Sequence, residues 1–173
     1  RILHPYTINH WRSWTVARRL LDGRPYVLQD DGMRLCTATH AADFATGFVG
    51  LWGNPAAMDE AFHITSDEYL TWRRVAELTA DALGVEPVFR FVPTDEFVRA
   101  VDPAAAEKLA ATAEHAVYDS GKLRRAVPEF SCGIRFAEGI RRTIAFYRAH
   151  PEYQWSDEAW DRIFDGLAER GRP

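Results

Sequence analysis

The stretch Asp43-Phe-Ala-Thr-Gly-Phe-Val-Gly-Leu-Trp-Gly53 decides how this chain is interpreted. Its glycines, Gly47, Gly50 and Gly53, recur at every third position. Its large apolar side chains recur at helical spacing and form one stripe: Phe44, Phe48, Leu51 and Trp52. The Gly53-Asn54-Pro55 sequence that follows is typical of a helix end. The segment is therefore either a glycine loop or a helix that ends near Trp52.

The glycine spacing is also a literal GxxGxxG, the pattern of a dinucleotide-binding loop. Such a loop follows a buried strand and opens a helix, so that a pyrophosphate sits on the helix N-terminus. The preceding residues, Arg34 to Asp43, do not form the continuous apolar run of a buried parallel strand. Phe44 occupies the position of the first glycine in the usual fingerprint. We therefore predict a packed helix over Asp43–Trp52.

Composition is compatible with one domain over residues 1–173. A chain with 47% hydrophobic and 13% aromatic residues can bury a substantial core. The net charge of −4 gives no reason to expect a nucleic-acid or anionic-membrane partner. Two cysteines, Cys36 and Cys132, are too few for a disulfide framework, which favours the cytoplasm. No apolar run approaches the roughly 18 residues of a membrane span.

Helical and extended patterns alternate along the chain, which predicts a mixed α/β fold. The expected helices are Trp14–Leu21, Asp43–Trp52, the segment capped by Thr71 and stopped by Gly84, a helix starting at Pro93–Glu96, Pro103–Ala113, Phe136–Tyr147 and Trp155–Arg170. The expected strands are Pro25–Gln29, Leu35–Thr39, Ala61–Thr65 and Val88–Val92.

Five blocks, in order from the first residue to about Tyr147, resemble those of one family. They are Arg1–Tyr6 (RILHPY), Asp31–Ala45 (DGMRLCTATHAADFA), Phe62–Thr65 (FHIT) with Leu70-Thr71-Trp72, Tyr118–Arg124 (YDSGKLR) and Phe136–Tyr147 (FAEGIRRTIAFY). They are similar to the RxxNxYGP, DGxxxRxxxHVxDxA, YNIG, DxxKxxR and SxxEGIxxTxxWY blocks of the extended short-chain dehydrogenases/reductases, the NAD-dependent epimerase/dehydratase group. Thr7-Ile8 replaces the Gly-Pro of the first block.

The resemblance implies a mixed α+β fold, the C-terminal substrate-binding portion of such an enzyme without most of its Rossmann sheet. NAD or NADP, and the catalytic Ser, Tyr and Lys, would then belong to an N-terminal half that precedes Arg1. The expected activity is that of an NAD(P)-dependent oxidoreductase, epimerase or dehydratase on a small carbonyl, hydroxyl or sugar-like substrate, absent from the isolated chain. Expected partners are the missing half and a second copy. The alternative is a non-catalytic module that binds a small ligand or a protein.

Tyr118 and Lys122 form a literal YxxxK, the spacing that places a catalytic tyrosine and its lysine on one helix face. Asp119 and Gly121 suit a helix cap and first turn, and Pro128 follows soon after. We therefore expect no catalytic residue in this chain.

The resemblance implies that the turn containing His4 and Tyr6 lies beside the nicotinamide and the reacting carbon. His4 would donate a hydrogen bond to cofactor or substrate. A polar and aromatic segment follows and is expected to contribute to the same substrate site: Asn9, Trp11, Arg12 and Trp14. Alternatively, its indoles anchor the first helix. His4 and His10 lack a third ligand at a diagnostic spacing, so we expect no metal site.

Cys36 occupies the position where nucleotide-sugar members of the family have an arginine that grips the substrate diphosphate. A thiol cannot do this, although Arg34, on the same face of a regular strand, can substitute in part. We therefore predict a substrate other than a nucleotide diphosphate sugar, with Arg34 and Cys36 at its site. His40 and Asp43 are expected to serve the strand-to-helix turn, with the carboxylate capping backbone amides.

Overall fold

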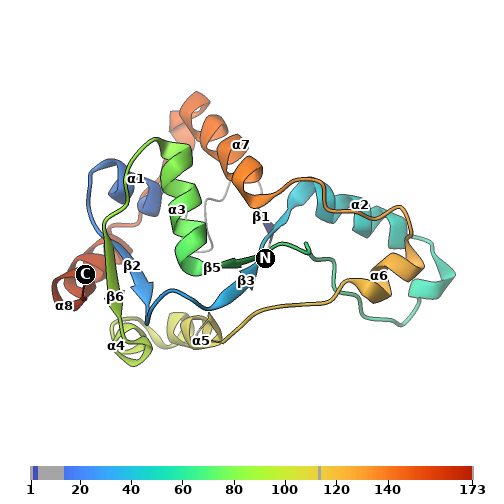
Figure 1. Cartoon of the computed structure of the whole chain (residues 1–173), viewed down its shortest axis with the longest axis horizontal. Helices are drawn as coiled ribbons and strands as arrows, with labels where there is room; N and C mark the ends of the chain where they lie inside the picture. The colour runs from blue at the N-terminus through green and yellow to red at the C-terminus, as the bar shows by residue number, and fades with distance from the viewer. Residues whose placement is uncertain (1, 4–13, 113, 173) are drawn as a thin grey trace.

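The computed structural model describes residues 2–3, 14–112 and 114–172, and in these ranges the chain is a mixed α/β protein (Figure 1). Its helices are α1 (Thr15–Leu21), α2 (Ala41–Leu51), α3 (Trp72–Leu83), α4 (Thr94–Arg99), α5 (Pro103–Thr112), α6 (Gly121–Ala126), α7 (Phe136–Ala149) and α8 (Glu158–Arg170). Its strands are β1 (Ile2–Leu3), β2 (Tyr26–Gln29), β3 (Leu35–Thr37), β4 (Thr39–His40), β5 (Tyr69–Thr71) and β6 (Phe89–Val92).

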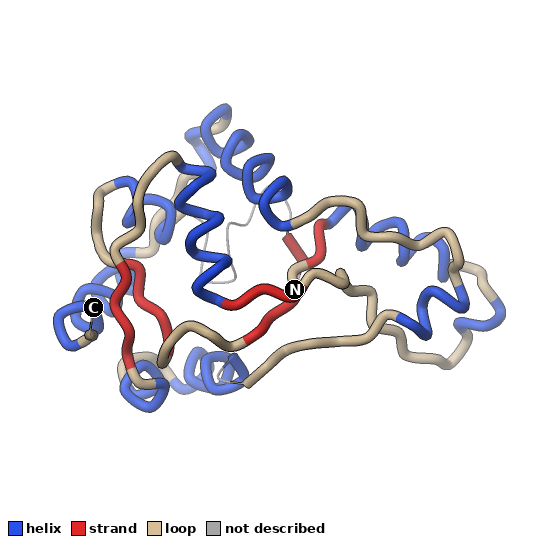
Figure 2. Tube along the Cα trace, in the orientation of Figure 1, coloured by secondary structure: helices blue, strands red, loops and turns tan. Residues whose placement is uncertain are grey.

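The described strands form three separate pairs. β1 lies parallel to β4, β2 lies parallel to β6, and β3 lies antiparallel to β5. Two single contacts extend these pairs. Phe91 in β6 exchanges two backbone hydrogen bonds with Arg172, of 2.8 and 3.0 Å, and Ala116 N–H donates to the Leu35 carbonyl at 2.8 Å. Parallel and antiparallel pairs therefore coexist without one continuous sheet, as Figure 2 shows.

The larger lobe surrounds α3. Thr71 accepts a hydrogen bond from Arg74 N–H at 3.0 Å, and Gly84 ends the helix with a left-handed φ of 80°. The predicted helix between these two residues is confirmed. Its buried face packs against α1 and α7, and α8 covers β2 and β6. The buried side chains of α3 are Val75, Ala76, Thr79, Ala80 and Leu83.

An ion-pair cluster with one buried member, Arg19, joins α1 to α8. Arg19, only 3% exposed, donates to Asp161 at 2.8 Å and to Asp165 at 3.0 Å. Arg24 binds the same two carboxylates. Burial alone would raise the pKa of Asp161, but the hydrogen bonds from Arg19 and Arg24 outweigh it and hold that pKa below its ordinary value. The two arginines and two aspartates therefore form one cluster that needs all its members.

The smaller lobe contains α2, α6 and the segments beside them, at the far end of the molecule from α8 (Figure 1). Its fully buried core is three residues: Leu123, Val127 and Phe130. α2 packs on this core through glycine. A Cβ on Gly50 would lie 2.4 Å from Val127 Cγ1, and a Cβ on Gly47 would lie 2.8 Å from Ile64 Cγ2. Both glycines therefore mark a close helix contact.

The helix predicted over Asp43–Trp52 is confirmed, with bounds Ala41–Leu51. Gly47 and Gly50 lie inside it, so the phosphate-loop interpretation is excluded. Only part of the predicted apolar stripe faces the core: Leu51 packs on it, whereas Phe48 is 51% and Trp52 is 80% exposed. Hydrophobic periodicity did not predict which face of α2 is buried. The face with Gly47 and Gly50 is buried, because glycine lets the helix backbone approach Ile64 and Val127 most closely.

Three other sequence predictions need correction. Ala61–Thr65 has no strand partner and is not a strand. Leu35–Thr39 is interrupted at Ala38, which separates β3 from β4. The terminal helix begins at Glu158 because the Asp157 side chain caps the amides of Ala159 and Trp160.

Substituting Gly50 by Ala should lower the free energy of unfolding by about 1 kcal/mol. Alanine favours a helix over glycine by about 1 kcal/mol, but overpacking a close contact costs about 1–3 kcal/mol. Gly166→Ala in α8 is the matched control, because the nearest atom to its Cβ is Arg170 Nη2 at 3.7 Å. Urea denaturation should show stabilisation for Gly166→Ala only. Stabilisation by both would contradict the packing argument.

Substituting Asp161 by Ala should cost about 2 kcal/mol, because it removes charged hydrogen bonds from Arg19 and Arg24 and leaves Asp165 as their remaining carboxylate partner. Asp95→Ala provides the comparison, because Asp95 pairs with Arg99 on the exposed face of α4. That change should cost less than about 1 kcal/mol. Equal midpoints in urea for the two variants would show that the cluster around Arg19 contributes no more than a surface pair.

Candidate functional site

The structure places three of the eight predicted substrate-binding residues. The other five lie outside the described residues: His4, Tyr6, Asn9, Trp11 and Arg12. A role for these five, including the cofactor contact of His4, stays a prediction.

Trp14 lies at the start of α1 and is buried, with its ring centroid 5.1 Å from that of Tyr147. The backbone N–H of Trp14 donates to the Trp155 carbonyl at 3.1 Å. These contacts anchor the start of α1 to α7 and to the segment before α8, as the alternative interpretation of the aromatic segment describes. A direct substrate contact by Trp14 stays a prediction.

Arg34 and Cys36 lie where the two lobes join. Cys36 is in β3, opposite Leu70 of β5, and is 2% exposed. The Arg34 carbonyl accepts a hydrogen bond from Trp72 N–H at 3.2 Å, at the start of α3. The Arg34 Nε is shielded from solvent and has no hydrogen-bond partner within the described part of the chain. A guanidinium and a thiol thus lie two residues apart on one strand segment.

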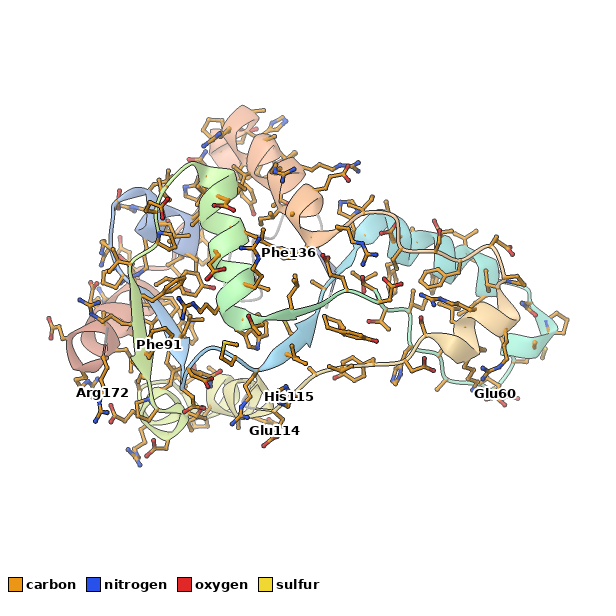
Figure 3. All side chains as sticks on the ribbon, viewed as in Figure 1. Glu60, Phe91, Glu114, His115, Phe136 and Arg172 are labelled. Carbon is orange, nitrogen blue, oxygen red and sulfur yellow. The ribbon has the colours of Figure 1, made fainter. Side chains whose placement is uncertain are left out.

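The segment 114–120 runs beside β3, and Figure 3 shows Glu114 and His115 at its start. His115 Nδ1 accepts a hydrogen bond from Leu35 N–H at 3.0 Å, and Ala116 bridges to Cys36. His115 must be unprotonated at Nδ1 to accept this bond. Neighbouring residues carry no signal for this contact, because eighty residues separate its partners.

Tyr118 and Lys122 do not share a helix face. Tyr118 precedes α6, is 45% exposed, and makes a ring contact with His63 at 5.1 Å. Lys122 lies in the first turn of α6, where its ammonium pairs with Glu60 and lies 4.7 Å from the Phe62 ring centroid. The Lys122 ammonium therefore contacts Glu60 and Phe62 and not Tyr118. This agrees with the prediction that the segment is a helix cap followed by a first turn.

His40 serves the strand-to-helix turn as expected, whereas the prediction that Asp43 caps the same turn is wrong. His40 Nδ1 caps α2 by accepting a hydrogen bond from Ala42 N–H at 3.2 Å. Asp43 does not cap its own turn: it accepts hydrogen bonds from Gly133 and Ile134 N–H, at 3.3 and 3.0 Å. The carboxylate therefore ties α2 to the segment that leads into α7.

Glu68 performs a similar role that the sequence analysis missed. Its Oε2 accepts a hydrogen bond from Phe136 N–H at 2.7 Å, at the start of α7 (Figure 3). Its neighbour Asp67 pairs with Arg124 and Arg135, at 3.4 and 3.1 Å. An acidic pair before β5 thus binds both α6 and the start of α7.

Neither thiol is set up as a nucleophile. Neither cysteine forms a disulfide within the described residues, and Cys36 is buried. Burial raises the pKa of Cys132 to about 11, and the carboxylates of Asp43 and Asp67 add to the effect. A thiol with this pKa stays protonated at neutral pH. Within the described ranges no three His, Cys, Asp or Glu side chains cluster as metal ligands, and none of the helices there is long and apolar enough to cross a bilayer.

No known family model matches the chain. Solved structures do match. An epimerase from Methanothermobacter thermautotrophicus superposes with a TM-score of 0.62 at 16% identity, over 87% of this chain and 38% of that one. UDP-glucuronic acid 4-epimerase from Bacillus cereus with NAD gives 0.57 at 14% identity, over 84% and 39%. UDP-glucose 4-epimerase from Thermus thermophilus with NAD gives 0.54 at 22% identity, over 78% and 39%.

The chain has the fold of part of an extended short-chain dehydrogenase/reductase. It spans about two-fifths of the length of these solved structures, at 38–39% of each. Among curated proteins, it is 32% identical over 83 residues to the chloroplast stem-loop binding protein of 41 kDa b from Arabidopsis thaliana. That match covers 48% of this chain and 22% of the relative. The resemblance seen in the sequence blocks is therefore confirmed at the level of the fold.

The His40 cap makes stability depend on pH. Burial lowers the pKa of His40 from 6.5 and Arg142 lowers it further, while Asp43 and Glu138 oppose the shift. Because the folded chain binds this proton more weakly than the unfolded chain, the stabilisation is complete above pH 6.5. It is lost as the pH falls from there through the folded pKa.

Substituting His40 by Asn, which caps without titrating, should flatten this loss between about pH 7.5 and pH 5. Unfolding midpoints in urea across that range provide the measurement. The control is His63→Asn, since His63 is exposed and should leave the native pH dependence in place. A His40→Asn variant with the native pH profile would show that another group is responsible.

Proposed function

We propose that this chain is the substrate-binding half of an NAD(P)-dependent epimerase/dehydratase-like oxidoreductase. In this proposal a nucleotide-binding half outside the chain supplies the cofactor site and the catalytic residues. The main support is the structure of the glycine segment. The stretch whose glycines have the spacing of a dinucleotide-binding loop is the packed helix α2. The fold match to about two-fifths of epimerases solved with NAD agrees with this division.

The division assigns different work to the two halves. The nicotinamide carries the hydride chemistry when it is bound, and the protein supplies orientation and electrostatics. This chain would hold the substrate against the cofactor with donors and an apolar floor. The proposed binding residues are His4, Tyr6, Asn9, Trp11, Arg12, Trp14, Arg34 and Cys36. Of the described ones, Arg34 is the charged donor at the junction of the lobes.

We further propose that the substrate is a small carbonyl, hydroxyl or sugar-like compound that lacks a nucleotide diphosphate. Cys36 is 2% exposed and carries no charge to offset a diphosphate. Arg34 offers a single guanidinium beside it, which suits one anionic or hydroxyl group. The nucleotide sugars named for the solved neighbours belong to proteins under 25% identical, so they do not define this substrate.

A non-catalytic module is the second candidate, favoured by the exposed aromatic side chains of α2. A fold of this kind can bind a ligand or a partner without reacting, because function depends on the site and not on the architecture. The two candidates differ in whether a longer polypeptide that contains this chain turns over a substrate with NAD(P).

The isolated 173-residue chain should show no saturable binding of NADH or NADPH in a fluorescence titration up to about millimolar concentrations. A longer polypeptide that includes a nucleotide-binding half should bind one of them. UDP-glucose and dTDP-glucose, titrated into that longer polypeptide, should bind more weakly than micromolar. Stoichiometric NAD(P)H binding by the isolated chain would overturn the division of labour, and micromolar UDP-glucose binding would overturn the substrate class alone.

A further inference from the structure

Arg34 carries a charge that the described part of the chain leaves unpaired. Its side chain is half-buried, and its Nε is shielded from solvent without a hydrogen-bond partner. No hydrogen bond or ion pair joins any atom of its guanidinium to another described residue. Removing a guanidinium from water without an acceptor costs free energy. An orphaned donor of this kind therefore points to an acceptor outside the described residues.

Arg19 shows how this chain pairs a buried arginine. The Nε of Arg19 also lacks a hydrogen-bond partner, yet its Nη1 donates to Asp161 at 2.8 Å and to Asp165 at 3.0 Å. Two carboxylates therefore compensate the charge of Arg19. Arg34 has no such carboxylate among the described residues, so its guanidinium lacks both a hydrogen-bond acceptor and a counter-charge.

The acidic residues nearest to Arg34 in the sequence already have other partners. The Asp30 carboxylate accepts hydrogen bonds from the N–H and the Oγ1 of Thr94, at 3.0 and 2.8 Å. Asp31 Oδ1 accepts a hydrogen bond from Met33 N–H at 2.9 Å. These carboxylates therefore hold a helix start and a turn, and the charge of Arg34 is left for another acceptor.

The backbone at Arg34 is held from two sides. The Arg34 carbonyl accepts a hydrogen bond from Trp72 N–H at 3.2 Å. The next residue, Leu35, donates to His115 Nδ1 at 3.0 Å and accepts from Ala116 N–H at 2.8 Å. The guanidinium therefore extends from a fixed point at the junction of the lobes. A charged donor on a fixed backbone is preorganised for a ligand.

We propose that Arg34 binds a carboxylate of the substrate, so that the substrate is a hydroxy or keto acid, sugar acids included. This inference rests on the proposed function, because it names a substrate class for the same site. The Nε–H and one Nη–H lie along one edge of the planar guanidinium and match the two oxygens of a carboxylate. A hydroxyl or carbonyl group would accept a hydrogen bond and leave the charge uncompensated. One carboxylate supplies both acceptors and the single counter-charge that Arg34 lacks.

Two matched pairs of probes test the carboxylate on a longer polypeptide that includes the nucleotide-binding half. Glycolate and D-glucuronate carry a carboxylate, whereas glycolamide and D-glucose have a neutral amide or hydroxymethyl group in its place. The NMR resonance of the Arg34 Nε–H is identified by its absence from the spectrum of the Arg34→Gln variant. It should shift saturably with at least one of the two acids and stay in place with both neutral probes.

Affinities measured by calorimetry should depend on the shape of the guanidinium as well as on its charge. Arg34→Gln should weaken binding of the acid by about tenfold or more, because it removes charged hydrogen bonds. Arg34→Lys should recover only part of this loss, since an ammonium group lacks the planar fork. The matched control is Arg162→Gln, which removes an exposed arginine of α8 and should leave the affinity unchanged.

Melting temperatures separate a ligand anchor from a structural arginine. In the isolated chain Arg34→Gln should not lower the melting temperature, because the change removes an unpaired charge. A fall of about 5 °C or more would show that Arg34 supports the fold, and the proposal would be wrong. If that fall occurs only in the ligand-free longer polypeptide, and neither acid shifts the Arg34 Nε–H, a carboxylate of the nucleotide-binding half is the partner and the proposal is equally wrong.

Inorganic phosphate distinguishes the kind of anion. Phosphate that binds at Arg34 more tightly than both acids would overturn the carboxylate assignment. A longer polypeptide that binds NAD(P)H but neither acid would overturn the role of Arg34 and leave the proposed function standing. One that binds an acid through Arg34 but never binds NAD(P)H would support the carboxylate site and refute the proposed function.

Discussion

The close contact of α2 with the segment around Val127 and Phe130 is the constraint on which the smaller lobe depends. It exists because Gly47 and Gly50 carry no side chain, so the helix backbone approaches Ile64 and Val127 at distances that no Cβ tolerates. Interiors are packed densely enough that one methyl group decides such an approach. The contact also sets the rotation of the helix about its axis. With the glycines facing inward, the rings of Phe48 and Trp52 are left on the surface.

Local pattern predicted most elements and failed where packing or pairing is non-local. The helix α3 follows from its cap at Thr71, its apolar periodicity and Gly84, all within one segment. For α2 the pattern predicted the helix but not its buried face, because hydrophobic periodicity gives no weight to glycine. Ala61–Thr65 has strand-like alternation, yet a strand exists only when another segment pairs with it. Local sequence shows that such a segment can form a strand, and the rest of the chain determines whether another segment pairs with it.

The candidate site shows the same division. Arg34 and Cys36 were predicted from their position in a sequence block that resembles the family. The structure places them at the junction of the lobes. The contacts that position this junction were not predictable from neighbouring residues. Asp43 reaches Ile134 across a sequence separation of 91, and Glu68 reaches Phe136 across 68. A carboxylate that caps distant amides has the same local sequence as one that caps its own turn.

The caps made by His40 and Asp43 also connect α2 to the candidate site. Asp43 belongs to α2, and the residue that caps this helix, His40, ends β4. β4 follows β3 after a single residue, and β3 contains Cys36. α2 is therefore linked to the strand segment of the candidate site through His40, and to the segment that leads into α7 through Asp43. Contacts of this kind hold side chains in a fixed geometry before a ligand arrives, which is the preorganisation that a binding site needs.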